Sequence, residues 1–98
     1  MLRSFAALSF LACLVACAGA PVQEMSDARQ AIQAARAAGA PTRAPDDFSA
    51  AQAAIQRAES QLQQHEYSSA RQAAIEAKHD ASVALAQAQS TGGTNPSP

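Results

Sequence analysis

The apolar residues of this chain form one uncharged run near the start and then three stripes at helical spacing. The run covers residues 4–16. In the stripes an apolar residue recurs at steps of three or four, which places the side chains on one face of a helix. The stripes are Met25, Ala28, Ile32 and Ala35, then Phe48, Ala51, Ile55, Ala58 and Leu62, and finally Tyr67, Ala70, Ala74, Ala77, Ala81, Ala84 and Ala88. They predict helices over about 22–38, 46–64 and 67–90.

Proline, glycine and acidic residues mark the boundaries of the first two helices. Pro21 stands where a first turn tolerates the missing N–H, and Gly39 followed by Pro41 is typical of a helix end. Asp46 and Asp47 then favour the start of the second helix, because acidic side chains suit the positive end of the helix dipole. These signals agree with the boundaries that the stripes predict.

The stretch 46–90 contains neither glycine nor proline, so it is either one rod or a hairpin. Continuing the second stripe past Leu62 would bring polar residues such as His65 and Gln72 into the buried seam. A clean apolar stripe restarts only at Tyr67. This slip favours a tight turn near 64–66 and an antiparallel hairpin of the second and third helices. A kinked rod is the alternative, because no glycine supports the turn.

Composition favours an all-α fold with a small three-helix arrangement over 22–90. Alanine and glutamine dominate this part, and β-branched and aromatic residues are too scarce for a sheet. Few large apolar side chains are present, so we expect a domain that is marginally stable or self-associates. Residues 91–98 are predicted to be a flexible tail. The formal net charge of −1 gives no electrostatic footprint for nucleic acid.

Residues 1–16 have the layout of an export signal. Arg3 gives a basic start, and the apolar run is shorter than the roughly 20 residues of a spanning helix. The segment Leu14, Val15, Ala16 and Cys17 resembles the lipobox of bacterial lipoprotein signals. The resemblance implies removal of residues 1–16 and acylation of Cys17. Cys13 is the poorer candidate, because the residues before it fit that pattern badly, and it would be lost with the signal.

Acylation would make Cys17 a membrane anchor without a transmembrane helix, since two or more acyl chains give stable anchoring. Residues 17–21 then form a short tether to the helical domain. The residue after the lipidated cysteine influences sorting, and Ala18 is not the aspartate associated with inner-membrane retention. The resemblance therefore implies an outer-membrane lipoprotein that faces the periplasm.

Three motifs in the helical part carry a second resemblance. They are the connector between Gly39 and Pro45, the Ala-x-x-x-Ile-x-x-Ala-Glu run from Ala51 to Glu59, and the Tyr-x-x-Ala-x-x-x-Ala-x-x-Ala run from Tyr67 to Ala77. Together they resemble the domain-of-unknown-function family 4398 of bacterial envelope lipoproteins. The resemblance implies a helical fold, an envelope location and no assigned enzyme activity. Some relatives are joined to peptidoglycan-binding domains of the outer-membrane protein A type, and we expect no such domain after residues 22–90.

Candidate chemistry in the helices is sparse. Glu76 and His79 form the Glu-x-x-His pair with which binuclear iron bundles bind metal, but such sites need a second pair and two further glutamates. We therefore interpret the pair as part of a solvated face. His65 and Glu66 fall at the predicted turn, and Tyr67 is expected to be a core aromatic at the start of the third helix. No catalytic residue, cofactor or metal site is predicted.

The remaining polar residues suggest protein contacts. Arg29, Arg36 and Arg43 are interpreted as surface charge. Glutamines form neutral polar faces that suit a coiled-coil flank or a weak protein contact; they are Gln30, Gln33, Gln52, Gln56, Gln63, Gln64 and Gln72. The sequence thus predicts a lipid-anchored, non-enzymatic envelope protein of structural or interaction type, with an envelope protein or a second copy as partner. The alternative is a periplasmic-side carrier of an apolar ligand such as an acyl chain.

Overall fold

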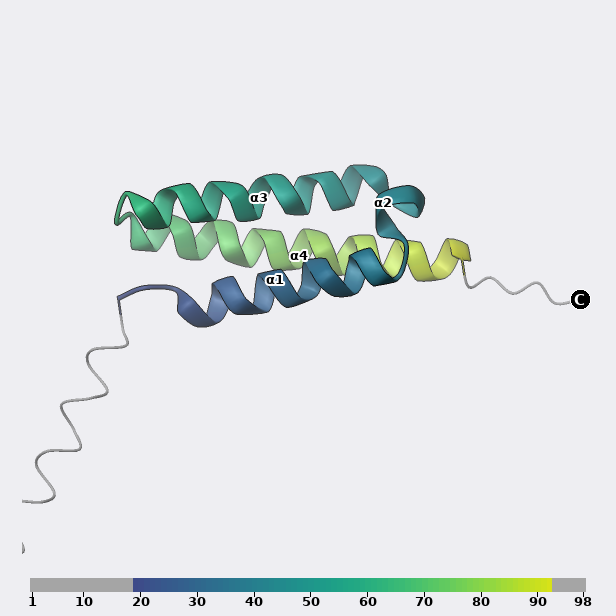
Figure 1. Cartoon of the computed structure of the whole chain (residues 1–98), viewed down its shortest axis with the longest axis horizontal. Coiled ribbons are helices and arrows are strands. Elements are labelled where there is room, and N and C mark those ends of the chain that lie inside the picture. Colours follow the sequence, from purple (N-terminus) through teal and green to yellow (C-terminus); the bar gives the residue numbers. More distant parts are fainter. Residues whose placement is uncertain (1–18, 93–98) are drawn as a thin grey trace, which may run out of the picture.

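Four helices make up residues 19–92, the part of the chain that the computed structural model describes (Figure 1). They are α1 (Val22–Ala37), α2 (Ala40–Arg43), α3 (Pro45–Gln63) and α4 (Tyr67–Gly92). No strand occurs in these residues, so the all-α prediction is confirmed. The three long helices match the predicted ranges to within two residues at each end. The tail predicted at 91–98 begins too early, because Thr91 and Gly92 still belong to α4. The rest of that tail, 93–98, and the predicted signal at 1–16 lie outside the described residues.

Helix α4 is the centre of the arrangement. It packs closely along α3 and along α1, whereas α1 and α3 contact each other much less. Figure 1 shows α3 and α4 side by side and running in opposite directions. The predicted hairpin is confirmed and the kinked rod is wrong. The α3–α4 turn and the start of α1 lie at one end of the bundle, and α2 and the last turns of α4 lie at the other (Figure 1).

The α3–α4 turn closes without glycine because His65 adopts the left-handed conformation, with φ of 62°. Its backbone N–H donates to the carbonyl of Leu62 at 3.0 Å, and the N–H of Glu66 donates to the carbonyl of Gln61 at 2.8 Å. These two bonds form the Schellman ending of a helix, which a glycine usually completes. The lack of glycine, which favoured a rod, is therefore met by a histidine in a strained backbone position.

The prediction of three helices missed the short α2. Gly39 ends α1 in the left-handed conformation, with φ of 86°, and its carbonyl then accepts from the N–H groups of Thr42 and Arg43 at 3.1 and 2.9 Å. Pro41 does not interrupt this turn, because the first turn of a helix has no partner for that N–H. Pro45 occupies the same tolerated position in α3, which begins one residue before the predicted start.

The core is built from the three predicted stripes and consists almost entirely of alanine. Every alanine of the α4 stripe is 0 % exposed. The larger buried side chains are Met25, Ile32, Phe48 and Ile55. Small side chains let the helix axes approach closely, so contacts between methyl groups replace the usual interlocking of large side chains. No buried side chain in residues 19–92 is polar or charged.

Several large apolar or aromatic side chains are not buried, among them two members of the predicted stripes, Leu62 and Tyr67. Leu62 and Tyr67 are half-buried, Val22 is 72 % exposed, and Ile75 is 47 % exposed. Val22 begins α1 at the end of the bundle, where no other helix covers it. Ile75 lies off the alanine stripe of α4. The apolar core is therefore thinner than the residue types alone suggest.

Candidate functional site

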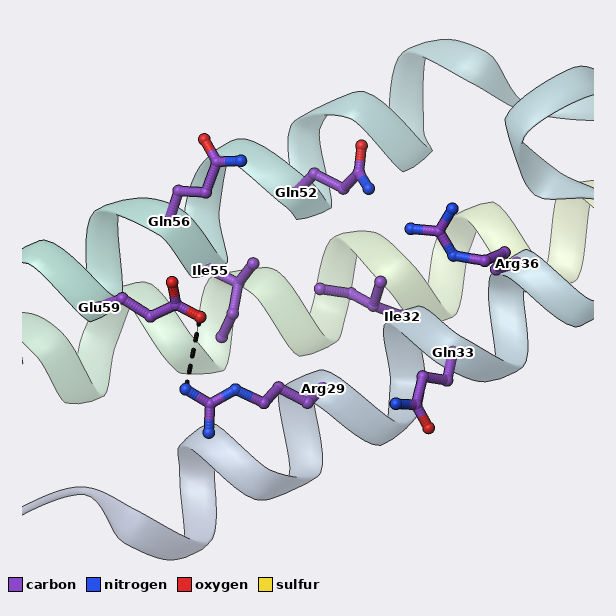
Figure 2. Close-up of a pocket in the computed structure, with 8 residues that line it drawn as sticks. All are labelled: Arg29, Ile32, Gln33, Arg36, Gln52, Ile55, Gln56 and Glu59. Atoms are coloured by element: carbon purple, nitrogen blue, oxygen red, sulfur yellow. Dashed lines mark hydrogen bonds and ion pairs between the residues drawn. The ribbon is translucent and has the colours of Figure 1, made fainter.

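A groove of about 400 Å³ lies between α1 and α3, because both helices rest on α4 and leave a gap between themselves (Figure 2). Eight residues line it, four from each helix: Arg29, Ile32, Gln33, Arg36, Gln52, Ile55, Gln56 and Glu59. Figure 2 shows α4 passing behind the gap. The groove is open to solvent along the surface of the bundle.

The floor of the groove is apolar and its rim is polar. Ile32 of α1 and Ile55 of α3 are each 8 % exposed and belong to the buried stripes. Gln33, Gln52 and Gln56 stand beside them on the rim. An amide offers both two donors and an acceptor, so these side chains can pair with either kind of polar group on a bound partner.

One ion pair crosses the groove. Arg29 Nη2 of α1 donates to Glu59 Oε1 of α3 at 3.3 Å, drawn as a dashed line in Figure 2. The two side chains are 53 % and 45 % exposed. An ion pair this exposed contributes about 0–1 kcal/mol to folding. It therefore bridges α1 and α3 across the groove and adds little to the stability of the bundle.

A second arginine lies further along α1. The guanidinium of Arg36 sits over the ring of Phe48, with Cζ 5.1 Å from the ring centroid. This cation–π contact covers the buried phenylalanine at the first turn of α3 and keeps the arginine charge at the surface. Arg43, by contrast, folds back and donates from Nη1 to the carbonyl of Ala38 at 3.2 Å. Two of the three arginines interpreted as surface charge thus line the groove.

The chain that precedes α1 is held against the start of α4. Arg71 donates from Nη2 to the carbonyl of Gly19 at 3.4 Å and from Nε to Glu24 Oε1 at 3.2 Å. A Cβ added at Gly19 would stand 3.8 Å from two ring carbons of Tyr67. Pro21 is fully buried. We call this set of contacts the clamp: Gly19, Pro21, Glu24, Tyr67 and Arg71.

The comparison with protein families decides the relationship. The sequence profile of the family described as "Domain of unknown function (DUF4398)" matches residues 23–92, which include all the groove residues and most of the clamp. The chain belongs to the DUF4398 family. The resemblance to the domain-of-unknown-function family 4398, predicted from three sequence motifs, is confirmed. No curated protein and no solved structure matches the chain.

Within this DUF4398 domain, Glu76 and His79 lie on an exposed face of α4, as interpreted from the sequence. Glu76 forms an ion pair with Arg57 of α3, and the imidazole of His79 is exposed. The described residues contain no group of three His, Cys, Asp or Glu side chains that could hold a metal ion. His65 instead packs edge-to-face on Tyr67, with ring centroids 5.9 Å apart. Tyr67 begins α4 as predicted, but its ring is part of the clamp and does not enter the core.

The lipidation site of the DUF4398 chain was predicted in the segment that precedes the described helices. Cys17 and the lipobox residues Leu14, Val15 and Ala16 lie outside the described residues. None of the described helices is long and apolar enough to cross a bilayer. The groove was also not predicted, although the glutamine faces were noted. Arg29 and Glu59 lie 30 positions apart, and no local spacing signals a contact over that separation.

Proposed function

We propose that this DUF4398 protein is a lipid-anchored, non-enzymatic component of the cell envelope that binds a helix of a partner protein in the α1–α3 groove. The groove carries this proposal, because an apolar floor flanked by amides and charges is suited to an amphipathic helix. The partner would lay its apolar side on Ile32 and Ile55 and pair its polar edge with the glutamines.

A helix fits this groove better than an extended peptide. An added strand needs a sheet edge to pair with, and the described residues form helices only. A helix packed beside α1 and α3 would complete a four-helix arrangement over α4, in which interhelical seams are shared by neighbours. The lining from Arg29 to Arg36 covers about 10 Å along α1. The bound helix therefore needs only about two turns in contact.

The anchor in this proposal is Cys17, acylated after removal of residues 1–16, with the protein on the outer membrane and facing the periplasm. The lipobox Leu14, Val15 and Ala16 supports it, as does Ala18 at the sorting position. Intact mass spectrometry of the membrane-extracted protein tests the anchor directly. The expected mass is that of residues 17–98 plus acyl groups. A chain that retains residues 1–16, or carries an unmodified Cys17 thiol, contradicts the anchor.

The groove is tested by photo-crosslinking in cells. A photoreactive residue at Gln56 is expected to trap one envelope protein, and the same residue at Gln87 on α4 is expected to trap none. The double variant Gln33→Arg and Gln56→Arg, with the crosslinker moved to Gln52, should lose the adduct, because long cations fill the groove. Gln30→Arg with Gln72→Arg is the matched control, since both positions are exposed outside the groove.

Three crosslinking outcomes are informative. An adduct of twice the chain mass identifies a second copy as the occupant. An adduct that survives the groove variant but not the control variant contradicts binding in the groove. No adduct from any groove position, in cells that produce the acylated protein, contradicts a protein partner.

A carrier of an apolar ligand is the second candidate, and the isoleucine floor is the observation that favours it. An acyl chain would lie on Ile32 and Ile55, but six polar side chains surround that floor. Lipid extraction of the purified domain followed by mass spectrometry separates the two candidates. A stoichiometric lipid that is lost from the Gln33→Arg and Gln56→Arg double variant supports the carrier function.

A further inference from the structure

We propose that the bundle stands on the membrane by one end, with the α3–α4 turn against the lipid headgroups and α2 farthest from them. This inference rests on the proposed acylation of Cys17 and adds the direction in which the protein points. The α3–α4 turn, residues 64–66, and the start of α1 are called the proximal end, and α2 marks the distal end. Both ends can be followed in Figure 1.

The clamp fixes where the chain leaves the bundle. The carbonyl of Gly19 accepts from Arg71, and Pro21, the N-cap residue of α1, is fully buried. The backbone is also tied at this point, since the N–H of Val22 donates to Ala20 at 2.9 Å and that of Met25 donates to Pro21 at 3.0 Å. The last described residue before the anchor is therefore held beside the first turns of α4.

The covalent chain then limits how far the anchor can be from this point. A single residue, Ala18, separates Cys17 from Gly19. At about 3.3–3.6 Å per residue, the Cα atoms of Cys17 and Gly19 are at most about 7 Å apart. The acyl chains thus emerge next to the proximal end, whereas α2 lies a full helix length away. A bundle tied at its tip with so little slack presents that tip to the headgroups.

The long sides of the bundle expose few apolar or basic side chains that would bind a membrane surface. A helix that lies in the interface needs an apolar face bordered by lysine and arginine. The large apolar side chains exposed in the described residues are Val22 and Ile75, and Val22 is already at the proximal end. Three arginines, Arg29, Arg57 and Arg71, are in ion pairs with glutamates of neighbouring helices. The other basic residues of 19–92, Arg36, Arg43 and Lys78, lie on three different helices.

Helix lengths then set the height of each feature above the headgroups. At 1.5 Å per residue, the 19 residues of α3 span about 28 Å. The groove begins at Arg29, about 10 Å above the start of α1, and extends to Arg36 at about 20 Å. A partner bound there must offer its helix at this height, outside the bilayer. The orientation thus restricts the partner class to proteins with a helix that projects from the membrane or reaches it from the periplasm.

Depth-dependent fluorescence quenching tests the orientation on the full chain as cells process it. If Cys17 is acylated, a cysteine introduced elsewhere is the only free thiol, since Cys13 is lost with the signal. Three exposed positions at increasing distance from the proximal end are labelled singly: Gln63→Cys, Ala53→Cys and Thr42→Cys. The labelled proteins are reconstituted in phosphatidylethanolamine–phosphatidylglycerol vesicles that carry a headgroup quencher. Quenching should be strong at 63, weaker at 53 and absent at 42.

Two variants separate the clamp from a general effect on folding. Arg71→Ala removes both contacts of the clamp arginine and should reduce the difference in quenching between positions 63 and 42. Arg57→Ala removes an ion pair between α3 and α4 that is not part of the clamp, and it should leave the difference unchanged. Circular dichroism on each sample confirms that the helices are intact.

The possible results distinguish this inference from the proposed function. Equal quenching at 42, 53 and 63 in an acylated protein means that the bundle lies flat, which overturns the orientation and leaves the anchor standing. Stronger quenching at 42 than at 63 reverses the orientation. An intact mass without acyl groups overturns the anchor and the orientation together.

Discussion

Arg71 of α4 and Glu24 of α1 form an ion pair, Nε to Oε1 at 3.2 Å, across 47 positions of the sequence. The same guanidinium also reaches the carbonyl of Gly19, so one side chain joins the incoming chain, the first turn of α1 and the second turn of α4. Both side chains are about one third exposed, at 34 % and 32 %. This pair is the most shielded of the ion pairs described above, because the other two have side chains 45–55 % exposed.

Replacing Arg71 with alanine should lower the free energy of unfolding by about 0.5–1 kcal/mol, because a partly shielded pair and a backbone contact are lost together. Urea denaturation followed by circular dichroism measures the change. The matched control, Arg57→Ala, should lose less, since its pair with Glu76 is more exposed. Equal losses in the two variants would show that the clamp does not stabilise the fold.

Replacing His65 with glycine should raise the free energy of unfolding by about 0.5–1 kcal/mol. His65 has φ of 62°, and a left-handed backbone costs a non-glycine residue about 1–2 kcal/mol, which glycine avoids at a smaller entropic cost in the unfolded chain. The control is Gln64→Gly, one residue earlier, where φ is −87° and glycine should destabilise the domain. A His65→Gly variant that is less stable than the natural chain contradicts the prediction.

The reverse change at Gly39 should lower stability. Its φ of 86° is unfavourable for any residue with a Cβ, so Gly39→Ala is expected to cost about 1 kcal/mol. A Cβ added there would meet the Arg43 side chain at 3.5 Å, an ordinary contact, so the loss reflects backbone conformation alone. Thermal and urea unfolding measure the stability of Gly39→Ala and of the exposed control Ala37→Gly. Stability unchanged by Gly39→Ala would mean that the α1–α2 corner rearranges freely.

Enlarging the alanine seam should be costly. Ala81 of α4 is 0 % exposed, and Ala81→Leu would force the helices apart, at about 1–3 kcal/mol or more. The neighbouring Ser82 is exposed, so Ser82→Leu is the control and should change the free energy of unfolding little. A leucine tolerated at position 81 as well as at position 82 would show that the seam is loosely packed.

Gln61 offers a way to stabilise the domain. Its Oε1 atom is buried and has no hydrogen-bond partner among residues 19–92. An unsatisfied buried acceptor costs about 1–3 kcal/mol, so Gln61→Leu should raise the free energy of unfolding by about 1 kcal/mol. Gln63→Leu, at an exposed position of the same helix, is the control that measures the effect of leucine itself. Equal effects at 61 and 63 would contradict the role of the buried oxygen.

The sequence predicted the long helices well because their buried residues repeat at one spacing. Alanine at Ala74, Ala77 and Ala81 is both a strong helix former and small enough to be fully buried in the seam, so propensity and packing agree. The α2 turn was missed because Gly39 and Pro41 were interpreted only as stop signals. Proline in a first turn and a left-handed glycine before it also begin a helix, and no local feature separates the two outcomes.

The groove and the clamp were not predicted, for a different reason. Each depends on side chains brought together by packing: Arg29 meets Glu59, and Arg71 meets Gly19, over separations of 30 and 52 residues. Arginine and glutamate are common on exposed helical faces, so their presence does not indicate which of them will pair. The glutamine faces were noticed from sequence, but only the gap between α1 and α3 selects Gln33, Gln52 and Gln56 from the seven.

Because the alanine seam of α4 is uniform, the alignment of the helices along their axes depends on residues outside the seam. Successive turns of that helix present the same methyl surface, so sliding a neighbour by one turn, about 5.4 Å, would exchange alanine for alanine with little change in contact. The alignment must therefore come from buried side chains that differ from alanine in size or shape. Phe48 in the first turn of α3 and Pro21 at the N-cap of α1 are both buried, and both differ from alanine in size and shape. These two residues therefore fix the positions of α1 and α3 along the uniform alanine seam of α4.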